Sequence, residues 1–269
     1  MTIQEKICAS NELQKYIRQQ SIIVPNDYRG TLAPNVIENK VGYKIFADSG
    51  GPICPEKYFS EGNYRILAIL KETRIKTLEE EESFLEGHDK AAEYCSCDYA
   101  DMEPTYQNLA KLAYALVNND TNFDDTKALI DCFRNNVCIV NINHFPNIKS
   151  APTNDGWINS WAQLNMNLLQ KQFELYEPSI VVGGHTITHL LREEQRTEDS
   201  GIILNQNVQY MLHDQIYDLF GSYFGKKNDT YYNQKQLLIN TYHPSYYLFE
   251  KRIELILRIR NYWQENLTK

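Results

Sequence analysis

Long hydrophobic runs are missing from this sequence, and no stretch reaches the ~18 apolar residues that a membrane-spanning helix needs. The N-terminus also lacks the apolar segment of a signal peptide. Both absences argue against a membrane protein or a secreted protein. We therefore expect a cytoplasmic protein without a membrane partner. A chain of 269 residues suits one α/β domain that spans residues 1–269.

Cysteine is scattered rather than arranged as a framework. The cysteines are Cys8, Cys54, Cys95, Cys97, Cys132 and Cys138. Two of them lie beside or inside apolar core segments, which favours reduced thiols over disulfides. Cys95 and Cys97, with His88 nearby, could bind a metal, but no second ligand pair follows at the spacing of a zinc site. We therefore expect neither a metal nor any other cofactor.

Positive charge is in the minority, because 27 Lys and Arg stand against 35 Asp and Glu and give a net charge of −8. This balance excludes a general polyanion binder. Acidic runs such as 79–82 are typical of solvated helix faces, so the composition still allows a local basic groove. Basic residues gather in two clusters, which are Lys71, Arg74 and Lys76, and Lys251, Arg252, Arg258 and Arg260.

Four short apolar runs are each followed by polar residues suited to chemistry. The runs are 65–70, 137–140, 179–182 and 237–239. Continuous apolar runs of this length, separated by helical stretches, are typical of strands buried on both faces of a parallel sheet. Ligands bind beyond the carboxyl ends of such strands. We therefore expect four side chains to surround one cleft: Glu72, Asn141, His185 and His243.

Helical stretches separate the apolar runs, and neither a linker nor a repeat divides the chain. Helices are expected at about 11–20, 108–117, 157–175, 213–224 and 248–263. The alternation of strands and helices predicts an α/β fold, a three-layer αβα sandwich around a central four-stranded parallel sheet. The polar stretch 73–103 is too long for an ordinary connection and predicts an insertion or a lid.

Several strand ends and one helix start carry an ordered set of motifs. They are the strand ending in Asn141, the segment from Asn154 to Trp157, the segment from Pro104 to Asn108, the strand ending in Gly183, Gly184 and His185, and the tripeptide His243-Pro244-Ser245. In order and spacing, this set resembles the motifs of the uracil-DNA glycosylase superfamily over most of the chain. The resemblance implies a monofunctional DNA glycosylase, a monomer that flips a pyrimidine out of DNA and hydrolyses its N-glycosidic bond.

The first motif departs from the pattern of that family. Family members carry a Gly-x-Asp-Pro turn whose aspartate handles the attacking water, whereas this chain has Leu70-Lys71-Glu72-Thr73-Arg74. Glu72 falls where the aspartate stands and is one methylene longer. The side chain that stacks on the base has two candidates, Tyr99 and Met102. Together with the long insertion, the altered motif favours a modified base, such as a bulky phage-type modification, over ordinary uracil.

The resemblance also implies roles for residues at the cleft. Glu72 would hold the water and offset positive charge on the sugar, and His243 would donate a hydrogen bond to the departing base. Asn141 would read the base through its amide. His144 is a further candidate for the base pocket, either in its wall or in a loop beside it. Contacts to DNA are expected from Lys71, Arg74, Gly183, Gly184, His185, Ser245, Tyr246, Tyr247 and Lys251. The two tyrosines would wedge into the base stack.

Simpler interpretations of the same residues stay open. Asn141 could cap the turn after its strand, and Glu72 could form a surface ion pair with Lys71 or Arg74. His185 could begin a helix without touching a substrate. For the whole chain, two other functions compete with a DNA glycosylase. One is a non-catalytic protein that binds nucleic acid or a protein partner, and the other is a nucleotide or nucleoside N-glycosidase.

Overall fold

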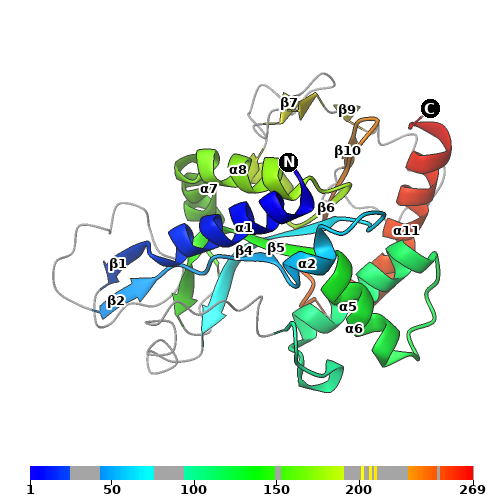
Figure 1. The fold of residues 1–269 in the computed structure, drawn as a ribbon. Helices are drawn as coiled ribbons and strands as arrows, with labels where there is room; N and C mark the ends of the chain where they lie inside the picture. The colour runs from blue at the N-terminus through cyan, green and yellow to red at the C-terminus, as the bar shows by residue number, and fades with distance from the viewer. Residues whose placement is uncertain are drawn as a thin grey trace.

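Apolar strands and amphipathic helices alternate along the chain and build an α/β fold. The computed structural model describes residues 1–24, 43–75, 94–148, 153–190, 201–202, 206–207, 209–210, 230–246 and 249–268. The strand order of the main sheet is β3-β5-β4-β6-β11-β10-β9. Helices lie on both sides of this sheet (Figure 1). The predicted α/β class is therefore confirmed.

The inner part of the sheet is parallel and its outer strands are antiparallel. The inner strands are β5 (Val137–Ile148), β4 (Ile66–Ile75), β6 (Ile180–Gly184) and β11 (Leu237–Thr241). The outer strands are β3 (Gly51–Pro52), β10 (Thr230–Tyr232) and β9 (Gln209–Tyr210). Two separate strand pairs are β1 (Ser21–Val24) with β2 (Tyr43–Phe46), and β7 (Gly201–Ile202) with β8 (Gln206–Asn207). The sheet is mixed and larger than the four parallel strands that were predicted.

Each inner strand is apolar on both faces because each face packs against helices. In β4, Leu67 and Ile69 join the core beneath one helical layer, while Ile66, Ala68 and Leu70 join the core beneath the other. The first layer contains α1 (Ile3–Arg18), α7 (Asp155–Leu164) and α8 (Met166–Tyr176). The second contains α5 (Pro104–Asn118), α6 (Thr126–Asn136) and α11 (Phe249–Asn266). The short helices are α2 (Pro55–Tyr58), η2 (Tyr99–Asp101) and α9 (Ile187–Leu190).

Several helix boundaries differ from the sequence predictions. The helix expected at 157–175 is wrong as one element, because the chain breaks at Asn165 between α7 and α8. The Asn165 side chain donates from Nδ2 to the carbonyl of Ile142 at 2.8 Å, which fastens this break to β5. The first helix begins earlier than expected, at a capping box formed by Thr2 and Glu5. The helix expected at 213–224 lies outside the described residues.

Strands β4 and β5 extend beyond the carboxyl ends of their neighbours. The last pair between β4 and β6 joins Ile69 to Gly183, whereas β4 and β5 stay paired as far as Ile75 and Ile148. At about 3.3 Å per residue, the extension is roughly 20 Å long. This overhang places polar residues of both strands beside the shorter strand ends.

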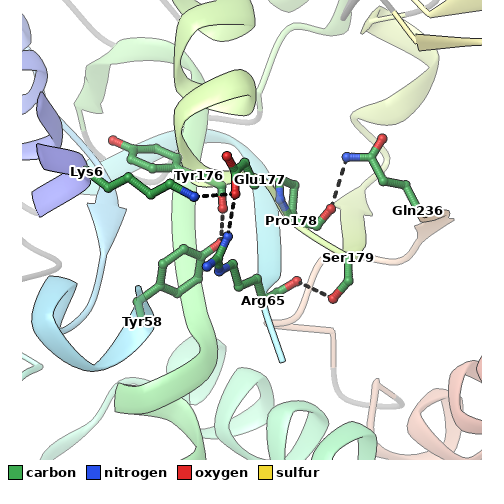
Figure 2. A network of polar contacts seen from close by, with 8 residues as sticks. All are labelled: Lys6, Tyr58, Arg65, Tyr176, Glu177, Pro178, Ser179 and Gln236. Atoms are coloured by element: carbon green, nitrogen blue, oxygen red, sulfur yellow. Dashed lines mark hydrogen bonds and ion pairs between the residues drawn. The ribbon is translucent and has the colours of Figure 1, made fainter. Parts of the chain in front are cut away.

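A polar network fastens the opposite, amino-terminal end of the sheet (Figure 2). Glu177, which follows α8, accepts hydrogen bonds at Oε2 from Lys6 Nζ at 2.6 Å and Arg65 Nη1 at 2.7 Å. Tyr58 donates from its hydroxyl to the carbonyl of Tyr176 at 3.1 Å, and burial raises the pKa of Tyr58 well above its ordinary value. The network joins α1, α2 and α8 to the start of β4, so the strand that carries Glu72 is anchored at its far end.

A disulfide joins Cys54 to Cys95, so the expectation of reduced thiols is wrong for this pair. The thiols of Cys8, Cys97, Cys132 and Cys138 are free. Cys54 precedes α2, and Cys95 lies just after the undescribed part of the predicted insertion.

Within the described ranges, no helix has the length and apolar character of a bilayer span.

Candidate functional site

A cleft of about 390 Å³ opens at the carboxyl ends of the inner strands. Its lining contains the four side chains expected there, together with residues from the start of α5. The lining residues are Leu70, Lys71, Glu72, Thr73, Glu103, Thr105, Tyr106, Asn141, Thr153, Gly184, His185, His243 and Ser245. Sequence reasoning did not assign Thr73, Glu103, Thr105, Tyr106 or Thr153 to the site. Parallel pairing of β5, β4, β6 and β11 brings the four strand ends to this one edge.

Glu72 is a buried carboxylate, with 7% of its surface exposed, on the overhang of β4. Its Oε1 accepts hydrogen bonds from Asn147 Nδ2 at 2.8 Å and from Thr153 Oγ1 at 2.9 Å. Its Oε2 accepts from Asn143 Nδ2 at 3.2 Å. Glu72 is therefore buried rather than on the surface, and amides and a hydroxyl hold both of its oxygens, while Lys71 pairs with Asp155 instead. Such a carboxylate is fixed in place at the cleft wall.

Asn141, at the end of the apolar part of β5, is 3% exposed and uses its amide nitrogen within the protein. Nδ2 donates to Thr73 Oγ1 at 2.9 Å and to Asp48 Oδ2 at 3.3 Å, and the Thr73 hydroxyl donates to the same Asp48 oxygen. The Asn141 Oδ1 atom is buried and has no hydrogen-bond partner among the described residues. Asn141 therefore lines the cleft with its amide nitrogen bonded to Thr73 and Asp48 and its carbonyl oxygen buried without a partner among the described residues.

Asp48 reaches Asn141 from a glycine turn that packs closely on β5. Gly50 has a φ of +57°, and a Cβ there would lie 2.4 Å from the carbonyl oxygen of Ile139. The Gly50 amide donates to Asp48 Oδ1 at 3.3 Å, and the Asp48 amide donates to the His144 carbonyl at 2.7 Å. Only glycine combines this conformation with this approach. The adjacent glycines at 50 and 51 are the sequence signal that could have placed Asp48 near the site.

The His243 ring has a fixed tautomer. The backbone N–H of Ser245 donates to His243 Nδ1 at 3.2 Å, and Ser245 Oγ lies 2.8 Å from the same nitrogen. Because a backbone N–H can only donate, Nδ1 is an acceptor and the neutral imidazole carries its proton on Nε2. The ring can therefore donate one hydrogen bond from Nε2.

Two neighbours hold the loop that carries His243. Asn108 of α5 donates from Nδ2 to the carbonyl of Pro244 at 2.6 Å. A Cβ at Gly184 would lie 3.1 Å from His243 Cα and 3.2 Å from Cδ2, so the absence of a side chain there leaves room for the loop.

The two glycines of β6, Gly183 and Gly184, were expected to admit a DNA backbone. Gly184 lines the cleft, whereas Gly183 is buried and faces Ile187, 2.5 Å from the position of a Cβ.

An aromatic and cationic cluster lies beside the cleft. The His185 ring lies edge-on to Tyr242 with centroids 5.1 Å apart, and Tyr242 stacks on Tyr246 at 4.8 Å. The Arg252 guanidinium lies 4.9 Å from the centre of the Tyr242 ring. Tyr246, expected as a wedge, is thus packed on a neighbouring ring, and Tyr247 lies outside the described residues.

Of the remaining residues predicted to contact DNA, some line the cleft and others do not. Lys71 lines the cleft and pairs with Asp155. Ser245 lines the cleft and is exposed, whereas Lys251 is exposed on α11 and is not part of the lining. Arg74 lies in β4 opposite Asn147. Arg260, counted in the second basic cluster, is 8% exposed and donates to the carbonyl of Leu116 at 2.9 Å, so it holds helices together.

Three residues expected in the base pocket lie away from the cleft lining. Met102 is 3% exposed in the core, and Tyr99 packs partly against the same core, where burial raises its pKa. Among the described residues, Tyr106 contributes a phenol ring to the cleft lining, and this ring lies 4.1 Å from that of Tyr94. His144 instead lines a second cavity of about 420 Å³ near α1 and α8. Its burial lowers its pKa to about 4, an effect that a nearby Asp48 backbone group opposes.

Comparisons with known proteins give no further guidance on identity. No protein-family model matches the chain, and searches of curated proteins and of solved structures found no match.

Proposed function

We propose that this chain is a monofunctional DNA glycosylase that flips a modified pyrimidine or uracil out of DNA and hydrolyses its N-glycosidic bond. One observation carries the proposal: a buried carboxylate, an amide whose carbonyl oxygen has no partner among the described residues, and an imidazole with its proton on Nε2 line the same cleft. A volume of about 390 Å³ suits a base with its sugar, since small-molecule sites span ~300–1,000 Å³. The residue motifs that resemble the uracil-DNA glycosylase superfamily support the same reaction.

The chemistry follows from the charges that develop. As the bond between C1′ and the base nitrogen breaks, its electron pair leaves with the base and positive charge grows on the sugar. His243 Nε2–H would donate to a carbonyl oxygen of the base, where negative charge appears only as the bond breaks. The Glu72 carboxylate would offset the positive sugar and orient a water molecule toward C1′. The water oxygen bonds to C1′, and one of its protons ultimately reaches the departing base.

The protein surface near the cleft also fits a nucleic acid strand. Lys71 and Ser245 line the cleft, and Arg252 and Lys251 follow on α11. Cationic and hydroxyl groups are the usual partners of phosphate oxygens. These contacts would hold the strand while the base enters the cleft.

An oligonucleotide panel tests the proposal. Single- and double-stranded DNA carrying uracil, thymine, cytosine and their 5-substituted forms is incubated with the protein, and abasic sites are then cleaved with alkali. We expect strand cleavage at one class of pyrimidine, with His243→Ala as the slow comparison. Binding without base release from any oligonucleotide contradicts the proposal and favours the binding protein. Base release from free nucleosides but not from DNA favours the nucleoside hydrolase.

A further inference from the structure

The disulfide between Cys54 and Cys95 joins the edge of the main sheet to the segment that leads into α5. Cys54 is 4% exposed and directly follows Ile53, whose amide donates to the carbonyl of Val137 in β5 at 3.0 Å. Cys95, by contrast, is an exposed residue. The bond is therefore anchored at one end, and a reagent in solution can approach it at the other.

The residue beside Cys95 connects the disulfide to the cleft. The ring of Tyr94 lies 4.1 Å from the ring of Tyr106, and the two residues are 6% and 8% exposed. Tyr106 lines the cleft together with Glu103 and Thr105, and we call these three residues the α5 margin of the cleft. A displacement of Tyr94 would therefore reach the α5 margin through a direct contact between buried rings.

Noncovalent contacts with α6 also hold the segment 94–97. Arg134 donates to the carbonyl of Tyr94 at 3.3 Å and to the carbonyl of Cys97 at 2.7 Å. The disulfide adds a covalent link to the sheet and closes a loop with a sequence separation of 41 residues. A crosslink of this kind restricts the open states of the chain. Its loss should leave the segment attached to α6 but open more often.

Three of the free thiols are poorly suited to attack this disulfide. Burial raises the pKa of the Cys97 and Cys132 thiols, and it raises the pKa of Cys138 well above its ordinary value. A thiol with a raised pKa carries little thiolate at neutral pH, and the thiolate is the attacking species. These three thiols therefore leave the disulfide intact, and its reduction requires a dithiol from solution.

We propose that Cys54 and Cys95 form a redox site whose oxidation state sets how firmly the α5 margin is held and, through it, how well the cleft binds its ligand. A thiolate of the dithiol attacks the Cys95 sulfur, the S–S bond breaks, and Cys54 leaves with the electron pair and takes up a proton. The second thiol of the reductant then displaces the Cys95 thiol. Two electrons and two protons pass to the protein, and the dithiol becomes a disulfide.

Thiol labelling tests whether the folded protein exchanges this bond. The protein is incubated with dithiothreitol, its thiols are trapped by acid, and a maleimide labels them in urea for mass spectrometry. We expect label at Cys54 and Cys95 only after dithiothreitol, while circular dichroism shows that the protein stays folded during the incubation. A bond that opens only when urea unfolds the protein is a structural crosslink and overturns the redox site. Label at both residues without dithiothreitol overturns it as well.

Backbone amide exchange tests the connection between the disulfide and the cleft. Oxidised and reduced protein are compared by mass spectrometry, with peptides that cover residues 99–110. We expect exchange in η2 and the first turns of α5 to be at least about fivefold faster after reduction. Exchange in α1, which belongs to the other helical layer, should stay unchanged. Equal exchange of 99–110 in both states, or equal acceleration in α1, overturns the connection.

Two variants separate the disulfide from the neighbouring thiol. Cys95→Ser combined with Cys97→Ser cannot form the bond and leaves Cys54 no partner in this segment. The double variant should show the fast exchange of the reduced protein with and without dithiothreitol. Cys97→Ser alone keeps the bond and should respond to dithiothreitol as the parent does. A response that is lost in Cys97→Ser would assign the effect to that thiol and overturn the proposal.

The effect on the cleft is measured with the oligonucleotide panel, and this step rests on the proposed function. Reduced protein should release the base at least about threefold more slowly than oxidised protein in a single turnover, because a cleft margin is held less firmly. Equal rates despite unequal exchange overturn control of the cleft by the disulfide. A panel that releases no base overturns the proposed function instead, whereas labelling and exchange still decide the redox site.

Discussion

His243 acts, in the proposed reaction, through a proton whose position the loop backbone determines. Ser245 N–H occupies Nδ1 at 3.2 Å, which leaves Nε2 as the donor. His243→Ala should therefore slow single-turnover excision by ~10²-fold or more while DNA affinity stays nearly unchanged. Rapid-quench kinetics and a gel-shift titration measure the two effects. His189→Ala, on α9 outside the cleft lining, is the control. An unchanged rate in His243→Ala would remove the imidazole from the mechanism.

Glu72 should respond to substitution in both rate and stability. Glu72→Gln removes the charge and places an NH₂ group in a site built from donors. Asn143 cannot turn its amide to compensate, because its Oδ1 already accepts from the Phe145 amide at 3.0 Å. The hydrogen bonds to a charged group become hydrogen bonds between neutral groups, which should lower the free energy of unfolding by about 1–3 kcal/mol.

Two measurements on Glu72→Gln separate its roles. Urea unfolding reports the stability, and single-turnover excision reports the rate. If the carboxylate serves the reaction, excision falls strongly under conditions where the variant is fully folded. A variant that is less stable but equally fast would make Glu72 a structural group and would leave the water to another residue.

The polar side chains of the site could be predicted only where an apolar run directly precedes them in the sequence. Glu72, Asn141, His185 and His243 follow apolar runs, so their meeting at one edge follows from parallel pairing. The partners of Asn141 do not follow in this way, because Asp48 and Thr73 lie 93 and 68 positions away and contact it only through the fold. The sequence therefore identifies Asn141 as a polar residue of the site, whereas tertiary packing determines which atoms of its amide form hydrogen bonds within the protein.

At the scale of elements, α5 lines the cleft with Thr105 and Tyr106 and holds the loop of His243 through Asn108. Asn108 on α5 donates to the carbonyl of Pro244 and so holds the loop of His243. Asn108→Ala should lower the excision rate roughly tenfold through misplacement of this loop, since small displacements of reacting groups are costly. Gln107→Ala on the same helix is the matched control, because Gln107 bonds the carbonyl of Tyr99 at 3.2 Å, outside the cleft lining. Similar rates in both variants would deny Asn108 a positioning role.

The four apolar runs predict the inner strands, whereas the shortest strands leave no pattern in the sequence. β3, β10 and β9 contain two or three residues each, too few for a hydrophobic pattern. The apolar spacing of 157–175 continues across α7 and α8, so the pattern gives no sign of the break at Asn165. That break depends on a bond to β5, which is a property of tertiary structure.

At the scale of the whole molecule, buried His144 should make stability depend on pH. Its pKa is about 4 in the folded protein, below the ordinary 6.5, because burial disfavours the charged ring. The unfolded chain therefore binds the proton more readily between these values. Stability is complete above about pH 6.5 and falls toward pH 4, by about 3 kcal/mol from this residue.

Urea unfolding from pH 4 to pH 7 measures this dependence. His144→Leu should flatten the profile, because leucine keeps the bulk and removes the titrating group. Asp48 contacts the His144 backbone, so the variant is first checked for its native spectrum. The same pH profile in the parent and in His144→Leu would show that other groups govern the acid sensitivity.

The unequal lengths of the inner strands give the cleft a direction. β4 and β5 extend roughly 20 Å past β6 and β11. One side of the cleft is therefore bordered by the extended strands β4 and β5, which we call the wall, and the other by the short ends of β6 and β11, which we call the ledge. A binding site with one wall has no twofold symmetry, and a ligand turned end for end would meet different groups. A DNA strand has a chemical polarity of its own. In the proposed complex it can therefore lie across the ledge in only one sense, so the protein would approach its target base from a fixed side, with the 5′ neighbour always on the same flank.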